Sequence, residues 1–168
     1  MYYAQIRKYD IANGPGVRSS LFVSGCTHNC PGCFNPDYMR FNYGNLWTKA
    51  IEDEFIKILS DPQVKGVTIL GGEPMDQIQD DDLLNLLKRI KSELGKNIWL
   101  YSGYTYEQIV QHEKQKKILS FCDVLVDGLF IEAKKDLKLK FRGSSNQRIV
   151  DIKKSLAANE IYLLNGYE

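Results

Sequence analysis

The most restrictive feature of this sequence is an eight-residue stretch that contains three of its four cysteines, Cys26-Thr27-His28-Asn29-Cys30-Pro31-Gly32-Cys33. Thiolates at this spacing, on a loop bent by glycine and proline, can each reach a different iron of one cubane cluster. Soft sulfur ligands suit iron–sulfur clusters and zinc. A cubane held by three thiolates leaves its fourth iron without a protein ligand, and a small molecule with an amine and a carboxylate can chelate that iron.

A zinc site and a pair of disulfides are the alternative interpretations of these cysteines. His28 can complete a Cys3His zinc set, although structural zinc sites typically join two separated pairs of ligands. Disulfides stabilise small secreted proteins, but a chain of 168 residues with 43% hydrophobic content can bury a core without them. Outside a zinc site, we expect His28 to be a solvated loop residue or a hydrogen-bond donor near the cluster. Cys122 is expected to be a small buried apolar residue.

Length and charge limit the class of protein. A chain of 168 residues fits one domain, so residues 1–168 are expected to form a single unit. Lys and Arg total 22 against 21 Asp and Glu, and a net charge of +1 lacks the excess that a nucleic-acid-binding protein normally shows. The sequence has no apolar run long enough to span a bilayer and no signal peptide. We therefore expect a cytoplasmic protein without a nucleic-acid or membrane partner.

The hydrophobic pattern predicts strands that alternate with helices. Strands are expected over residues 20–25, 67–70, 97–101 and 123–127. Helices are expected over 46–60, 80–94 and 105–119. Residues 2–11 are predicted to form a short edge strand or arm, and 149–168 a strand with a short helix or frayed end. This order indicates parallel β/α units, but the chain is too short for the roughly 250 residues of a closed eight-stranded barrel. The predicted fold is α/β, an open partial (β/α) barrel.

Each predicted parallel strand ends in residues with a possible use. The cysteines follow the first strand, Gly71-Gly72-Glu73-Pro74 the second, Ser102-Gly103 the third and Asp127-Gly128 the fourth. Carboxyl ends of parallel strands meet at one edge, so these segments are expected to converge. Paired glycines let the backbone approach a ligand closely, and Glu73 can assist in binding an ammonium group. Gly-Gly-Glu-Pro is by itself also a common turn.

The spacing Cys-x3-Cys-x2-Cys resembles that of the radical S-adenosylmethionine (SAM) enzymes. Five motifs narrow the likeness to one family, the anaerobic ribonucleoside-triphosphate reductase activating proteins. They are Asn13–Arg18, Leu21–Cys26, Cys30–Cys33, Asp123–Gly128 and Phe141–Gln147. The resemblance covers roughly residues 10–148. Another small radical SAM activase and a non-catalytic zinc or electron-carrier module are the rival interpretations.

The resemblance implies a function and a set of site residues. Members of this family cleave SAM reductively and form a glycyl radical on the large subunit of the reductase, which requires an electron donor such as flavodoxin. Cys26, Cys30 and Cys33 would be the ligands of a [4Fe-4S] cluster. The residues implied to contact SAM are Gly32, Cys33, Phe34, Gly72 and Glu73, with Ser102 as a weaker candidate and Leu129, Phe130 and Ile131 on the adenosyl side.

A protein substrate also needs a docking surface. Two segments are candidates for it: residues 35–43, which are rich in aromatic side chains, and residues 134–140, which are rich in lysine. Lysine-rich runs are often only solvated surface. The chain is too short for a closed barrel and lacks a long lid, so we expect the mouth of the partial barrel to admit a loop of another protein.

Overall fold

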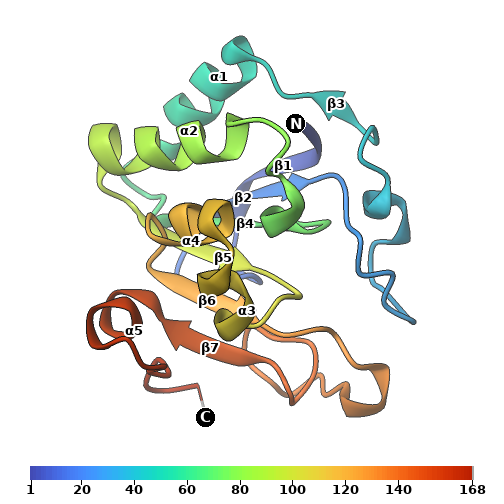
Figure 1. Cartoon of the computed structure of the whole chain (residues 1–168). Helices are drawn as coiled ribbons and strands as arrows, with labels where there is room; N and C mark the ends of the chain where they lie inside the picture. Colours follow the sequence, from blue (N-terminus) through green and yellow to red (C-terminus); the bar gives the residue numbers. More distant parts are fainter. Residues whose placement is uncertain (168) are drawn as a thin grey trace.

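The computed structural model describes residues 1–167, and its centre is a seven-stranded mixed sheet with the strand order β3-β1-β2-β4-β5-β6-β7 (Figure 1). The strands are β1 (Tyr2–Asp10), β2 (Arg18–Val23), β3 (Asn45–Leu46), β4 (Gly66–Gly71), β5 (Asn97–Tyr101), β6 (Val124–Asp127) and β7 (Arg148–Asp151). β2, β4, β5 and β6 are parallel, as predicted, while β1, β3 and β7 run antiparallel to their neighbours. β3 and β7 form the two edges, so the sheet does not close.

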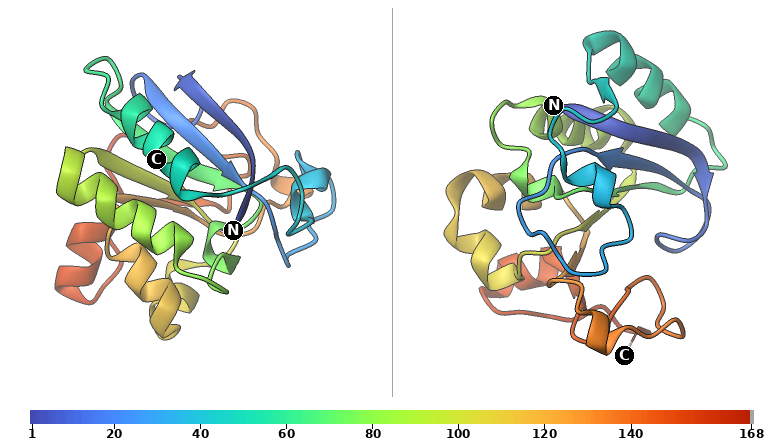
Figure 2. Two further views of the ribbon diagram at one scale, coloured as in Figure 1. Left: turned by 90° about the horizontal axis from the view of Figure 1, so that it is seen from above. Right: turned by 90° about the vertical axis from the view of Figure 1, so that its right-hand side faces the viewer.

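Five α-helices within the described part of the chain connect the strands or follow them. They are α1 (Lys49–Leu59), α2 (Asp82–Arg89), α3 (Tyr106–Gln111), α4 (Glu113–Leu119) and α5 (Ile152–Ala158). Their buried side chains pack with alternate residues of the strands, such as Leu21, Ile69 and Leu100, in the main core. The left view of Figure 2 shows this helical layer along the sheet. Cys122 lies fully buried in this core, as predicted. Among residues 1–167, no helix combines the length and apolar composition needed to cross a bilayer.

The opposite face of the sheet carries a smaller core around Trp99, Val126 and Ile149. Phe141 and Tyr167 cover it, with ring centroids 5.6 and 5.9 Å from that of Trp99. Beyond α5 the chain returns along β7, where Leu164 N donates to Ile149 O at 2.8 Å. The C-terminal segment therefore covers the smaller core beside β7.

Three predicted elements differ from those observed. Residues 105–119 form two helices, because the chain leaves the helical conformation at His112 (φ −106°, ψ 117°), whose side chain caps α4. The predicted helix 46–60 begins only at Lys49, after its N-cap Thr48, and residues 45–46 pair with β1 instead. β1 is consequently flanked by β3 and β2 and is not an edge strand. The predicted strand and short helix after residue 148 are confirmed as β7 and α5.

The carboxyl ends of the four parallel strands lie at one edge of the sheet, and long loops extend from it. The loop after β2 carries the three clustered cysteines, and the segment between β6 and β7 spans residues 128–147. The right view of Figure 2 shows the two segments side by side, in blue and orange. Their contact is direct, because the rings of Phe34 and Phe130 pack in a tilted arrangement with centroids 4.9 Å apart.

Candidate active site

Cys26, Cys30 and Cys33 line one open cavity of about 190 Å³ at this edge of the sheet. All three are half-buried free thiols. The ends of the other parallel strands complete the wall, with Gly71 and Gly72 from β4, Ser102 and Gly103 from β5, and Gly128 from β6. The predicted convergence of the strand ends is confirmed.

The thiol geometry fits a cluster better than a single zinc ion. Zn–S bonds of 2.3 Å in a tetrahedron place sulfurs roughly 3.8 Å apart. Within residues 1–167, the three thiols do not form a group whose donor atoms all lie within 4.8 Å of one another. Wider spacing suits a cubane, in which each thiolate binds a different iron. Burial raises the pKa of Cys26 to about 11, so iron binding has to displace a proton there.

The donor group that does lie within 4.8 Å consists of Cys26, His28 and Asp76. The His28 and Asp76 donors are already engaged in hydrogen bonds within the protein. His28 Nε2 lies 2.6 Å from Glu73 Oε1. Burial lowers the pKa of His28, but the hydrogen bond with Glu73 and the negative charges of Glu73 and Asp76 together outweigh burial, so the net pKa is above its usual value. A zinc ion bound by Asp76, or by His28 through Nε2, would have to compete with these hydrogen bonds.

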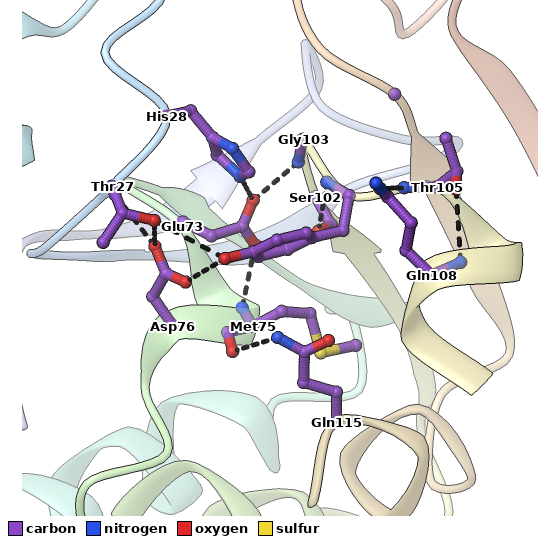
Figure 3. A network of polar contacts seen from close by, with 12 residues as sticks. Thr27, His28, Glu73, Met75, Asp76, Ser102, Gly103, Thr105, Gln108 and Gln115 are labelled. Carbon is purple, nitrogen blue, oxygen red and sulfur yellow. Dashed lines mark hydrogen bonds and ion pairs between the residues drawn. The ribbon is translucent and has the colours of Figure 1, made fainter. Parts of the chain in front are cut away.

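Glu73 is the centre of a hydrogen-bond network that joins three strand ends (Figure 3). Its Oε1 accepts from Gly103 N at 2.6 Å and contacts His28, while its Oε2 accepts from Met75 N at 2.8 Å and Ser102 Oγ at 2.9 Å. The side chain is 1% exposed. Both oxygens are thus occupied by partners within the protein, which holds the cysteine loop, the turn after β4 and the turn after β5 together.

Asp76 makes a second connection from the turn after β4 to the cysteine loop. Its Oδ2 accepts from Thr27 N and Thr27 Oγ1, each at 2.9 Å, and its Oδ1 accepts from Tyr104 OH at 2.6 Å. Figure 3 shows Thr27 and Asp76 beside the Glu73 network. Sequence analysis missed Thr27, Asp76 and Tyr104. The available signal was Asp76, an acidic residue three positions after Glu73 in a turn that begins at Pro74.

Gly72 lines the cavity, but its missing side chain serves the protein packing. A Cβ at this position would lie 2.6 Å from Gly25 O and 2.7 Å from Tyr38 O. The backbone explains this crowding, because Glu73 N donates to Gly25 O and Gly25 N donates to Tyr38 O, both at 2.8 Å. Glycine at position 72 therefore allows the end of β4 to approach the residues on either side of the cysteine loop.

The other predicted SAM residues fall into two groups. Phe34, Phe130 and Ser102 line the cavity with the cysteines. Leu129 and Ile131 line a neighbouring groove instead. Gly32 adopts a φ of +72°, a left-handed conformation that favours glycine, inside the cysteine loop.

Comparison with known proteins gives the same cluster chemistry. A family model described as a 4Fe-4S single cluster domain matches residues 12–150. An anaerobic ribonucleoside-triphosphate reductase-activating protein of Escherichia coli K12 is 44% identical over 150 residues, which cover 88% of this chain and 96% of that protein. The chain belongs to this family of activating proteins. Proteins of the same name from Vibrio cholerae and bacteriophage T4 are 41% and 37% identical, each over 89% of this chain and over 97% and 93% of their own length.

Membership of the activating-protein family agrees with the resemblance seen in the sequence motifs. The matched region contains the cysteine loop, Glu73 and the segment from β6 to β7. The residues that form the cavity are therefore within the part of the chain shared with the 4Fe-4S domain. This donor set of three thiols, with an open cavity beside it, fits a cluster with one free iron.

Proposed function

We propose that this chain is a radical SAM activase that forms the glycyl radical on the large subunit of anaerobic ribonucleoside-triphosphate reductase. The observation that carries the proposal is that the three thiols of the Cys-x3-Cys-x2-Cys loop line one cavity with the glycine-rich end of β4. Cys26, Cys30 and Cys33 would hold a [4Fe-4S] cluster, which would supply the electron for reductive cleavage of SAM and so for removal of a hydrogen atom from a glycine of the partner. The electron has to come from a donor such as flavodoxin.

The residues of the chain have separate tasks in this proposal. Cys26, Cys30 and Cys33 hold the cluster. The backbone of residues 32–34 and of Gly72 binds the methionine part of SAM, and Ser102 and Phe130 border the rest of the ligand. The Glu73 carboxylate, whose four hydrogen bonds are all within the protein, positions these elements. This assignment uses protein groups to bind and orient, as is usual where a cofactor carries the chemistry.

The proposal extends to the fold and the setting of the protein. The four parallel strands, with the site at their carboxyl ends, support an open partial barrel of radical SAM type formed by residues 1–168 as one domain. Free thiols suit a reducing cytoplasm. The net charge of +1 gives no support for a nucleic-acid partner.

The test is anaerobic reconstitution with iron and sulfide. The visible spectrum should show a [4Fe-4S] cluster, reduction with SAM should yield 5′-deoxyadenosine, and addition of the reductase large subunit should give a glycyl radical signal by electron paramagnetic resonance. Replacing Cys26, Cys30 or Cys33 with Ser should abolish all three results, while the matched control Cys122→Ser should retain them. A complete cluster in Cys30→Ser, or no glycyl signal with active wild type, would contradict the proposal.

A further inference from the structure

A groove of about 590 Å³ lies beside the cavity of the cysteines, on the face of the sheet opposite the α-helices. Its floor is formed by side chains of three neighbouring strands, Phe22 of β2, Leu70 of β4 and Tyr101 of β5. The groove and the cysteine cavity share six lining residues: Phe34, Asn35, Leu70, Tyr101, Phe130 and Gln147. A segment of another protein that lies in the groove is therefore brought to the cysteines.

One wall of the groove contains the sequence motif Asn13–Arg18, for which the site described above has no use. Asn13 lines the groove. Its Nδ2 donates to Asp10 Oδ2 at 2.8 Å, and its O accepts from Thr68 Oγ1 at 2.6 Å. Arg18, which is buried, donates from Nε to the same Thr68 Oγ1 at 2.9 Å. These bonds fix the wall before a partner arrives, and a preformed wall lowers the entropic cost of binding.

The opposite wall is formed by part of the segment between β6 and β7. Leu137 and Leu139 line the groove there, and Leu137 is exposed. Tyr101 OH donates to Phe141 O at 2.6 Å, which ties this wall to the floor. Phe34, at the junction with the cysteine cavity, is also exposed. Exposed apolar side chains that gather along a groove are typical of a site that contacts another protein.

Arg7 of β1 adds a cation to the lining of the groove. Its side chain is exposed, and its guanidinium carbon lies 4.7 Å from the centroid of the Phe22 ring. The carboxylate of Asp10, on the same strand, is buried and accepts from Asn13 Nδ2 and Ser20 Oγ. Within residues 1–167, no hydrogen bond or ion pair engages the Arg7 guanidinium. A ring beneath it orients the planar group and leaves its N–H donors available to a carboxylate.

The other charged side chains of the groove are engaged within the protein. Arg142 Nη1 donates to Gln147 O at 2.7 Å. Asp136 Oδ1 accepts from Lys138 N at 2.9 Å. Arg7 is therefore the charged group that the lining offers to a partner, and the groove favours an acidic segment.

We propose that this groove binds an extended segment of the reductase large subunit and that Arg7 selects an acidic side chain on that segment. The inference rests on the proposed function, which makes this subunit the substrate. Arginine binds a carboxylate through two parallel hydrogen bonds, so the contact recognises geometry as well as charge. The apolar floor and the exposed Leu137 hold the rest of the segment, and Phe34 marks where it enters the cysteine cavity.

The first experiment compares Arg7→Gln with the matched control Lys8→Gln, which removes the same charge from the next residue of β1. Lys8 lines a different groove, with Glu54 and Lys57. Glycyl radical formation is measured at increasing concentrations of the large subunit. For Arg7→Gln, kcat/KM for the subunit should fall about tenfold, as expected for the loss of a charged hydrogen-bond donor. Lys8→Gln should resemble wild type, and both variants should cleave SAM without the partner at the wild-type rate.

The second experiment identifies the group on the partner. Two peptides cover the glycine of the large subunit that becomes the radical, one with the natural sequence and one with every Asp and Glu changed to the amide. Wild type and Lys8→Gln should bind the natural peptide about tenfold more tightly than the amide peptide, whereas Arg7→Gln should bind both with equal affinity.

Three results would overturn the inference. They are equal binding of the two peptides by wild type, the same preference retained by Arg7→Gln, and a parallel fall of SAM cleavage without the partner, which would place Arg7 at the SAM site. A wild-type chain that forms no glycyl radical on the large subunit contradicts the proposed function instead. The peptide affinities would then still decide whether Arg7 selects a carboxylate.

Discussion

His28 Nε2 and Glu73 Oε1 lie 2.6 Å apart, although 45 positions separate the two residues in the chain. This contact ties the cysteine loop to the end of β4. Because Glu73 also accepts from Met75 N, Ser102 Oγ and Gly103 N, one buried carboxylate connects three of the four strand ends that surround the cavity. Glu73, with Asp76 as the second connection, therefore holds these elements of the site together.

Glu73→Gln should therefore destabilise the chain, although the glutamine side chain is nearly the same size as that of glutamate. The amide NH2 must replace one carboxylate oxygen, and either choice leaves a backbone N–H, that of Met75 or of Gly103, without its acceptor. An unpaired buried donor costs about 1–3 kcal/mol, so we expect the free energy of unfolding to fall by that amount. Denaturant unfolding of the chain without a cluster measures it. The exposed Glu54→Gln is the control, and equal stability of the two variants would show that Glu73 is not a structural centre.

Gly72→Ala should already weaken the cysteine loop. The Cβ of alanine would lie 2.6 Å from Gly25 O and 2.7 Å from Tyr38 O, so the backbone has to move before any ligand is present. We expect lower unfolding stability and a smaller yield of reconstituted cluster, and Gly72→Val should be worse than Gly72→Ala. If Gly72→Ala instead forms a full cluster in a stable chain and loses only SAM affinity, the glycine serves the ligand and not the packing. Calorimetry with SAM distinguishes the two results.

The parts of the site predicted from the sequence are those whose chemistry is local. Three cysteines at fixed spacing can bind a cluster in almost any fold that exposes them, and glycines after apolar runs mark strand ends. Asp76 and Tyr104 could not be assigned this way, because their contact depends on how the turn after β4 and the turn after β5 meet in space. The C-terminal residues could not be assigned either, since Tyr167 acquires its role through packing on Trp99 and Phe141 and through a hydrogen bond from Arg142 to its carbonyl oxygen.

In the fold, too, the features with a local sequence pattern were predicted, and those that depend on contacts in space were not. Strand positions followed from buried apolar runs, and the parallel order followed from the helices between them. The break at His112 was not predicted, although the polar residues around it gave no apolar stripe to sustain one long helix. The position of β1 inside the sheet depends on a two-residue strand, β3, which is too short to leave a pattern in the sequence.

Asp123 should make the stability of the chain depend on pH. Burial raises the pKa of this carboxyl, but the hydrogen bonds from Lys91 and Ile98 N, with the positive charge of Lys91 and the contact with Lys153, together outweigh burial, so the net pKa is below 3.8. Its contribution is thus present above pH 3.8 and is lost as the pH falls through the lower pKa of the folded state. The difference in unfolding free energy between wild type and Asp123→Asn should be largest near pH 6 to 7 and shrink toward about pH 3. A difference that does not change with pH would contradict this.

Charge reversal at Lys138 and Lys140 tests the docking surface proposed from the sequence. Both lysines are exposed, and Leu137 beside them, 86% exposed, lines a groove that also contains Phe34 of the cysteine loop. Lys135 is left unchanged because its Nζ lies 5.3 Å from the Phe34 ring centroid, where a substitution would disturb the site itself. Lysines at a docking rim act mainly by steering the encounter with an acidic partner surface.

Lys138→Glu with Lys140→Glu should accordingly slow glycyl radical formation on the reductase, on the order of 10-fold at low ionic strength, and the difference from wild type should diminish as salt is added. Lys114→Glu with Lys117→Glu, exposed on α4, carries the same charge change away from the site and should have little effect. SAM cleavage without the partner should stay at the wild-type rate in both variants. If that rate falls in parallel with glycyl radical formation, residues 138–140 support the SAM site, and the partner docks elsewhere.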